Sequence, residues 1–284
     1  MNLENNGERV APHRLESNPT HKRKKRKNNK VLYYVLLFVL LAVLVFSAIK
    51  IISYLNQQRL SEKQQDAITD EFVTPVYNGE DTSGDGENSG LSTKPGEPQP
   101  EQIRVNFDKL IEKYPDVVGY IYGANTGINY PIVQGNDNDY YLKHDYDGNN
   151  NNNGSIFMEY LCRDDFGSRN SIIYGHHMKS GRMFAALENY KSQGYYDAHP
   201  YFYIYTPYQN YRLDVFAGCV VEGDAEIYSL SPSSDTIAEL VARSTFKSKI
   251  GTPVGNIVTL STCDYTSGYS DPRYVVLGQL VPIE

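Results

Sequence analysis

Cys263 and Arg273 are the residues of this chain whose types and spacing best suit nucleophilic chemistry. Residues 256–260 (NIVTL) are mostly apolar and β-branched, a pattern typical of a buried strand, so Cys263 comes at a strand end. Turn-forming residues fill positions 264–272, and residues 273–281 have the pattern of a second strand. Two adjacent strands would set Arg273 beside Cys263, where a guanidinium stabilises a thiolate and can hold a developing oxyanion. The alternative is a small buried cysteine that only packs, which is the usual role of a cysteine on a strand.

Two neighbouring histidines, His176 and His177, follow a predicted strand over residues 172–174 in the run IIYGHHM. Adjacent histidines point in different directions, and the sequence has neither a Cys-x-x-Cys nor a His-Glu-x-x-His spacing, so a zinc site is disfavoured. We therefore expect no metal and no cofactor. By residue type alone, His176 and His177 would be assigned structural roles, as would His144 and His199, which belong to no motif.

These motifs, taken together and in their chain order, resemble the sortases, which are cysteine transpeptidases of Gram-positive cell surfaces. The run TLSTC at 259–263 with Arg273 is similar to the TLxTC signature and downstream arginine of that family. The run YGHH at 174–177 resembles the catalytic-histidine loop of class B, and residues 128–142 resemble the same class. The resemblance extends over about residues 101–284.

The resemblance implies a reaction and a role for each of three residues. Cys263 would attack the threonine carbonyl of a C-terminal sorting motif, of the NPQTN or NPKTG kind, and form a thioester. Arg273 would steady the oxyanion, and His176 would protonate the departing amine and then deprotonate the incoming one. The implied partners are surface proteins that bear a sorting signal and a peptidoglycan crossbridge amine.

Residues close to these three are predicted to contact the substrate. Ser261, Thr262 and Asp264 flank the nucleophile, although they could equally satisfy backbone groups. Tyr174 is predicted to line the groove, but the chain has 25 tyrosines, so its type alone is weak support.

The first part of the chain predicts a membrane anchor. Residues 1–30 carry nine Lys or Arg against three acidic residues and are expected to form a cytoplasmic basic tail. Residues 31–49 are almost wholly apolar, and at about 1.5 Å per residue their helix approaches the roughly 30 Å of the hydrocarbon layer. We predict a single-pass protein of the cell membrane with an extracellular catalytic domain. A cleaved signal peptide is the alternative, disfavoured by the long apolar run and the poor cleavage site at 47–50.

Residues 50–100 are predicted to be a stalk and a disordered linker. Residues 51–72 have loosely helical apolar spacing, whereas residues 73–100 contain too few apolar side chains to fold.

The charge of the chain argues against nucleic-acid binding, and its cysteine count argues against a set of cysteines that are all paired in disulfides. The net charge is −7 despite the basic tail, so the folded part is acidic and is not expected to bind nucleic acid. Three cysteines cannot all form disulfides with one another, and Cys162 and Cys219 are interpreted as structural or incidental.

Residues 101–284 predict a mainly β fold. Short strands, tight turns and few helices indicate a small barrel, and the resemblance sharpens this to the eight-stranded sortase β-barrel, preceded by one transmembrane helix. An N-terminal helix is expected from the spacing of apolar residues 103–111, and a long helix over residues 236–247, capped by Ser233, is expected before the cysteine strand. A hairpin is expected over residues 117–134.

Four alternatives stay open from the sequence. The chain could be a thiol endopeptidase on the sortase scaffold or a sortase that polymerises pilins. A papain-like hydrolase is disfavoured, because such enzymes usually place the cysteine before the histidine and at a helix start. An anchored adhesin or scaffold would leave Cys263 as a packing residue.

Overall fold

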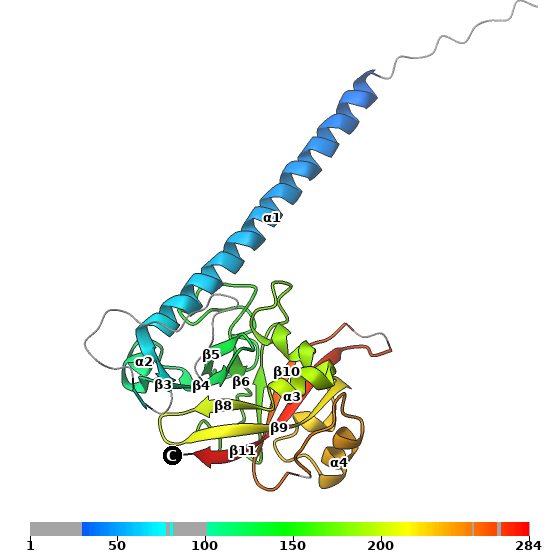
Figure 1. The fold of residues 1–284 in the computed structure, drawn as a ribbon. Helices are drawn as coiled ribbons and strands as arrows, with labels where there is room; N and C mark the ends of the chain where they lie inside the picture. The colour runs from blue at the N-terminus through cyan, green and yellow to red at the C-terminus, as the bar shows by residue number, and fades with distance from the viewer. Residues whose placement is uncertain (1–29, 78–79, 82–100, 252, 266–267, 284) are drawn as a thin grey trace, which may run out of the picture. The chain divides into compact units, whose positions relative to one another are not determined.

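A closed β-barrel forms the core of the computed structural model, which describes residues 30–77, 80–81, 101–251, 253–265 and 268–283. The predicted basic tail and most of the predicted linker lie outside the described residues. The chain divides into two units, Met1–Ile51 and Ile52–Glu284. The barrel belongs to the second unit (Figure 1).

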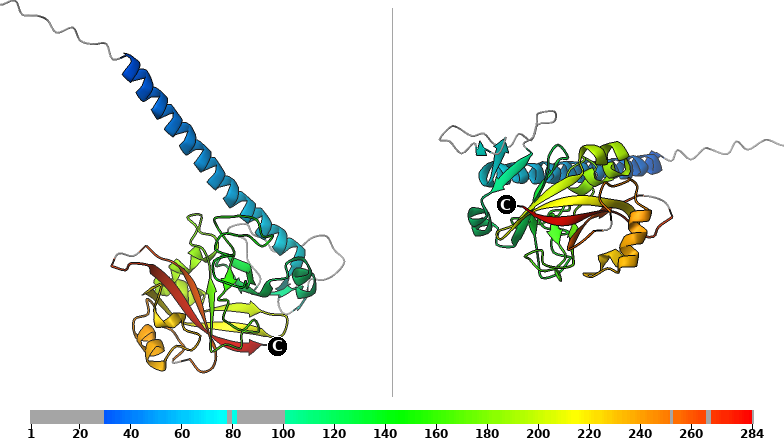
Figure 2. Two further views of the ribbon diagram at one scale, coloured as in Figure 1. Left: turned by 180° about the vertical axis from the view of Figure 1, so that it is seen from behind. Right: turned by 60° about the horizontal axis from the view of Figure 1, so that its bottom comes forward.

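The eight barrel strands follow the order β10-β11-β9-β8-β4-β5-β6-β7, which confirms the predicted eight-stranded barrel (Figures 1 and 2). Neighbouring strands are antiparallel except for the pairs β5 with β6 and β7 with β10. The predicted hairpin is β4 and β5, and the predicted cysteine strand is β10. The bounds are β4 (Val117–Gly123), β5 (Ile128–Val133), β6 (Phe157–Met158), β7 (Asn170–Tyr174), β8 (Tyr201–Tyr205), β9 (Asn210–Glu222), β10 (Ile257–Cys263) and β11 (Pro272–Ile283).

Side chains of β10 alternate between the barrel interior and its outer face, as the two-residue period of a strand requires. Val258 and Leu260 belong to the large interior cluster. Ile257 belongs to a separate outer cluster that also contains residues of helix α4 (Ser234–Ala242). Cys263 has the same parity as Ile257, so the strand directs it to the outer face at its carboxyl end.

Helix α4 lies before the cysteine strand, as predicted, and Ser233 caps it by accepting a hydrogen bond from the Thr236 backbone N–H. It is shorter than predicted, because it ends at Ala242 rather than continuing to residue 247. Phe246, which the helical pattern included, instead packs in the interior cluster. Three short helices complete the barrel surroundings: η1 (Phe184–Lys191), α3 (Gln193–Ala198) and η2 (Glu226–Tyr228).

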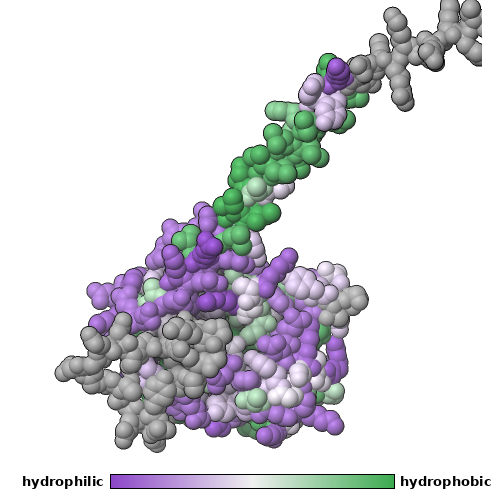
Figure 3. Space-filling model, turned by 45° about the horizontal axis from the view of Figure 1, so that its top comes forward, coloured by the Kyte–Doolittle hydropathy of each residue, from purple (hydrophilic) through white to green (hydrophobic). Residues whose placement is uncertain are grey.

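Helix α1 (Lys30–Phe72) contains both the predicted span and the predicted helical stalk. It is long and apolar enough to cross a membrane, by length and composition alone. Its large apolar side chains are exposed from Val31 to Leu55, and Figure 3 shows them as a hydrophobic stretch.

The last turns of α1 are packed on the barrel, which the sequence interpretation did not foresee. Ile68 and Phe72 are buried in a cluster with Tyr120 of β4. Directly after the helix, β1 (Val73–Tyr77), assigned to the linker from sequence, pairs with β2 (Glu80–Asp81) and β3 (Gln102–Val105). Strand pairing across so long a loop leaves no periodicity in the sequence.

The helix predicted at the start of residues 101–284 is present but starts later than its apolar spacing suggested. Helix α2 spans Phe107–Lys113, and the Asn106 side chain caps it by accepting from the Lys109 backbone N–H. Ile103, which the spacing placed in the helix, is a buried residue of β3.

Candidate active site

The three predicted catalytic residues come from the ends of three neighbouring strands. In the antiparallel pair of β10 and β11, Cys263 lies directly opposite Arg273. In the parallel pair of β7 and β10, Ser261 lies opposite Tyr174. If that register is continued by two residues, Cys263 falls opposite His176. Parallel strands end at the same edge of a sheet, so the fold brings His176 and Cys263 to one edge of the barrel.

Gly175 allows this close approach. Its backbone N–H donates to Ser261 O at 3.0 Å, and its own oxygen accepts from the Thr262 hydroxyl at 2.9 Å. A Cβ at this position would lie 2.5 Å from the ring of Phe184 and 2.6 Å from Ile156 Cδ1. Glycine is therefore required by space here, not by its backbone angles.

The Arg273 guanidinium contacts the sulfur of Cys263 directly. Its Nη1 donates to Sγ at 2.9 Å, and its Nη2 donates to both carboxylate oxygens of Asp271, at 2.7 and 2.9 Å. The second interaction fixes the plane of the guanidinium and so aims its other edge at the sulfur. Cys263 is half-buried and forms no disulfide. The positive charge can stabilise negative charge on sulfur or on an oxygen formed beside it.

His176 lies with Cys263 and Arg273 around one cavity of about 80 Å³. Partial loss of hydration lowers the pKa of the His176 imidazole from its ordinary value of 6.5, and the neighbouring His177 lowers it further. The side chain remains exposed to solvent. An imidazole that changes its charge near neutral pH can both give and take a proton.

His177 occupies a different place from His176, against the backbone of Cys263. Its Nδ1 lies 2.8 Å from Cys263 O, and its Nε2 lies 3.3 Å from a carboxylate oxygen of Glu188. Glu188 is also 3.1 Å from Lys191 Nζ, which lies 2.6 Å from the carboxylate of Asp264. This chain of polar contacts surrounds the segment that follows β10.

The four predicted substrate-binding residues divide into two groups. Ser261 and Thr262 line the cavity that holds Cys263, as does Tyr174. Ser261 and Tyr174 also line an adjoining cavity of about 230 Å³. Asp264 is not among the residues that line either cavity, and its side chain is buried against Lys191.

Two partners of the groove residues, the half-buried Tyr228 and the buried Glu159, were not anticipated from sequence. The Tyr228 hydroxyl lies 2.8 Å from Ser261 Oγ, and the Tyr174 hydroxyl donates to Glu159 at 2.9 Å. The rings of Tyr174 and Tyr228 stack, with their centroids 6.2 Å apart. Each contact joins segments far apart in the chain, and no motif or periodicity could have indicated it.

The other two cysteines lie away from this cavity. Cys162 and Cys219 are buried and free, and burial raises the pKa of each thiol to about 11. Thiols of this kind are poor nucleophiles at neutral pH. In the part of the chain that the structure describes, no three His, Cys, Asp or Glu side chains are grouped as a metal site requires.

Comparisons with known proteins by family model, by sequence and by structure all identify the same family. A sequence model of the sortase domain matches residues 124–281. Sortase B of Listeria monocytogenes serovar 1/2a is 35% identical over 188 residues, which are 63% of this chain and 76% of that protein.

Two solved structures extend the comparison to the fold. The Staphylococcus aureus sortase B-substrate complex has a TM-score of 0.58 at 28% identity and covers 63% of this chain and 85% of that chain. Sortase B from Bacillus anthracis in complex with AAEK1 has a TM-score of 0.61 at 30% identity and covers 82% of this chain and 100% of that chain. The second alignment covers more of the chain than residues 101–284 contain, so it includes part of the preceding segment. The chain therefore belongs to the sortase family, and the relatives that it matches are of class B.

Proposed function

We propose that Cys263, His176 and Arg273 carry out the cysteine transpeptidation that class B sortases perform. The observation that carries this assignment is the 2.9 Å contact between Arg273 Nη1 and Cys263 Sγ, in a cavity that His176 also lines. The order of the three residues along the chain and their motifs support the same assignment.

In the first half-reaction, Cys263 Sγ attacks the carbonyl carbon of a threonine in the sorting signal. The C=O electron pair moves onto oxygen, and Arg273 holds the resulting oxyanion. As the C–N bond breaks, the imidazolium of His176 gives its proton to the departing amine, which leaves a thioester on Cys263.

In the second half-reaction, an amine attacks the thioester carbonyl while neutral His176 takes a proton from this amine. The tetrahedral intermediate then expels the Cys263 thiolate and leaves a new amide bond. One histidine thus serves as acid and then as base, and the enzyme returns to its starting protonation state.

The substrate is a surface protein with a sorting motif of the NPQTN or NPKTG kind, and the acceptor is a peptidoglycan crossbridge amine. The two adjoining cavities, of about 80 and 230 Å³, provide space on one side of Cys263 for an extended peptide. A relative with the same fold, Staphylococcus aureus sortase B, has been solved as a complex with a substrate, which supports the proposal that this chain binds a substrate as well.

Residues 31–49 anchor the protein in the cell membrane, with residues 1–30 in the cytoplasm and the catalytic domain outside. The apolar part of α1 and the basic residues that precede it support this orientation. A reporter fused after Glu284 should be digested by external protease in intact cells. Protection of that reporter would reverse the orientation.

A transfer assay separates the proposed transpeptidase from a thiol endopeptidase on the same scaffold. Water at about 55 M competes for the thioester, so a transpeptidase must exclude it or hold the amine in place. With a sorting peptide alone, acyl-enzyme should accumulate and cleavage should be slow. Adding a crossbridge-like amine should accelerate turnover and yield a ligated peptide detectable by mass spectrometry. If a panel of such amines does neither, the endopeptidase is the correct alternative.

A further inference from the structure

The loop that carries His176, residues 175–183, is closed on itself and is called the histidine loop here. The Phe184 backbone N–H donates to His176 O at 3.1 Å, and His177 and Met183 form an isolated β-bridge. A tight turn between them is closed by the Gly181 backbone N–H, which donates to Met178 O at 2.9 Å. Outside these internal bonds, the loop is held by the contacts of Gly175 and His177 with β10 and by the contacts of its last two residues.

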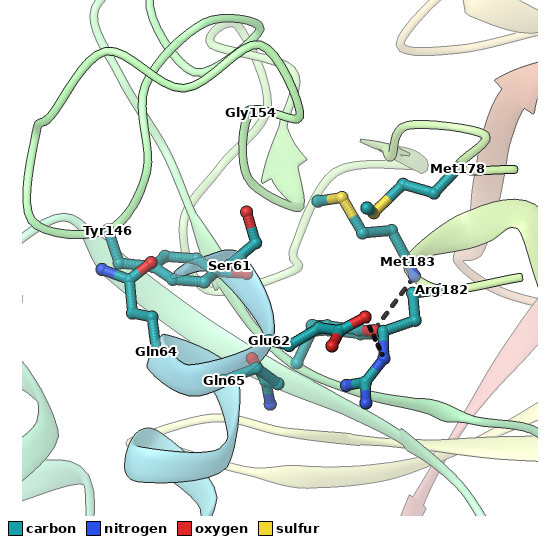
Figure 4. A pocket seen from close by; sticks show the side chains of 10 residues that line it. Ser61, Glu62, Gln64, Gln65, Tyr146, Gly154, Met178, Arg182 and Met183 are labelled. Atoms are coloured by element: carbon teal, nitrogen blue, oxygen red, sulfur yellow. Dashed lines mark hydrogen bonds and ion pairs between the residues drawn. The ribbon is translucent and has the colours of Figure 1, made fainter. Parts of the chain in front are cut away.

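Three of these outer contacts come from Arg182 and Met183, the last two residues of the loop. Arg182 Nε lies 3.3 Å from Glu62 Oε1, and Arg182 Nη1 lies 3.9 Å from Asp66 Oδ1. Glu62 and Asp66 are one turn apart on helix α1. The Met183 backbone N–H donates to the Tyr130 hydroxyl of β5 at 3.0 Å. Figure 4 shows Arg182 and Glu62 facing each other across this junction.

The backbone at Met183 needs such support. Its φ is 56°, in the left-handed region that residues other than glycine rarely adopt. A conformation of this kind persists where the surroundings hold it in place. The contact of Arg182 with Glu62 and the bond from the Met183 N–H to Tyr130 hold this backbone conformation in place.

Helix α1 is itself fixed at this point, so it can act as a support. Gln65 is buried, with 6% of its surface exposed, and its side-chain nitrogen donates to Thr69 Oγ1 at 3.2 Å and to the Tyr120 hydroxyl at 3.4 Å. The hollow between the helix and the histidine loop measures about 20 Å³, which is space for about one water molecule. The junction is therefore a packed contact and not a ligand site.

We propose that the segment of α1 around Glu62 positions the histidine loop for catalysis through Arg182. Arg182 is a positioning residue: it acts on His176 through the loop backbone. The proposal rests on the catalytic role proposed above for His176. In this proposal, the helix that carries the candidate membrane span also positions a loop of the active site.

The test uses the full chain in detergent and compares four variants with the unaltered protein. Arg182→Gln removes both ion pairs of Arg182, Glu62→Gln removes the pair with Glu62 and leaves the one with Asp66, and Arg182→Lys keeps the charge. Lys113→Gln is the matched control, because Lys113 pairs with Glu71 of α1 at 2.6 Å but lies on α2 and not on the histidine loop. Hydrogen exchange of residues 175–183 and the rate constant of acyl-enzyme formation at saturating sorting peptide are measured for each variant.

Arg182 and Glu62 are about one third exposed, and a pair of this kind changes an equilibrium by about two- to fivefold. Arg182→Gln and Glu62→Gln should accelerate exchange in the histidine loop by about that factor and slow acylation similarly, with KM unchanged. Arg182→Lys should restore part of the protection of the loop from exchange and part of the acylation rate. Exchange in β8 and β9 should be the same in all variants, and Lys113→Gln should match the unaltered protein.

Two results would overturn the proposal. Unchanged loop exchange in Arg182→Gln would show that the ion pair does not hold the loop, whatever the activity. Faster loop exchange with an unchanged acylation rate would show that the support has no catalytic role. Full activity in His176→Ala would instead refute the proposed mechanism, and the exchange data would still decide whether α1 holds the loop.

Discussion

The imidazole of His177 contacts the backbone of Cys263, with Nδ1 2.8 Å from Cys263 O. Its other nitrogen lies 3.3 Å from Glu188 Oε2, so the ring is held from both sides. His176, the preceding residue, lines the cavity beside the sulfur. Two adjacent residues of the same type thus hold different positions: His177 contacts the end of β10, and His176 lines the cavity beside Cys263.

Replacing Cys263, His176 or Arg273 by alanine should lower the transpeptidation rate by about 10²- to 10⁴-fold or more, because each supplies a separate element of the reaction. The measurement is product formation from a sorting peptide and an amine. Circular dichroism melting curves should show that each variant stays folded. Near-normal activity in any one of them would remove that residue from the mechanism.

His177→Ala should have a smaller effect, because it removes one hydrogen bond to the Cys263 carbonyl and no reacting group. A bond of this kind is worth about 0.5–1.5 kcal/mol, so acylation should slow by about two- to tenfold. Steady-state kinetics of His177→Ala and His176→Ala under the same conditions test the assignment. If His177→Ala abolishes turnover and His176→Ala does not, the two roles are reversed.

The pH dependence of acylation should reflect the lowered pKa of His176. Loss of hydration and the charge of His177 both disfavour the imidazolium, so the proton-donating form is lost as pH rises through a value below 6.5. In His177→Gln the nearby charge is absent, and the pKa of His176 should rise. Titration of the His176 imidazole resonance by NMR in both proteins measures the shift, and a downward shift would contradict this account.

Gly175→Ala should destabilise the domain, because the new methyl group would lie 2.5–2.6 Å from Phe184 and Ile156. Overpacking of this kind costs about 1–3 kcal/mol, and relief of the clash would displace His176. Gly194→Ala is the control, since its Cβ would meet only Ser192 Oγ at 3.9 Å. Thermal melts and activity of the two variants should differ, with Gly194→Ala at least as stable as the parent protein.

Ile68→Ala should lower the free energy of unfolding by about 2–5 kcal/mol, because Ile68 is a core residue although it lies on α1. Leu60→Ala on the same helix is the control: Leu60 is 63% exposed, so the change should stay within about 0.5 kcal/mol. Denaturant unfolding of both variants provides the measurement. The same packing predicts that a chain beginning at Glu101 is less stable than one beginning at Ile52. Equal stability of Ile68→Ala and Leu60→Ala would mean that α1 contributes nothing to the core.

The pairing of Cys263 with Arg273 could be predicted from the sequence because the two strands are neighbours in the chain. A short run of turn-forming residues joins them, and adjacent antiparallel strands set their facing ends side by side. The apolar pattern of residues 256–260 was likewise sufficient for a buried strand, since Val258 and Leu260 fill the interior. The shorter α4 shows the limit of such patterns: Phe246 fits a helical spacing but packs from outside the helix.

The sequence by itself determined the family of this protein, through the motifs that contain Cys263, His176 and Arg273. The tertiary structure alone decided how His176 comes to lie beside Cys263, through the parallel pairing of β7 with β10. It also decided that His177 bonds to the Cys263 carbonyl and that Glu62 of α1 pairs with Arg182. Each of these contacts joins segments distant in the chain. Hydrogen bonds between such segments are selected by the closure of the barrel and the packing around it, and they leave no periodicity in the sequence.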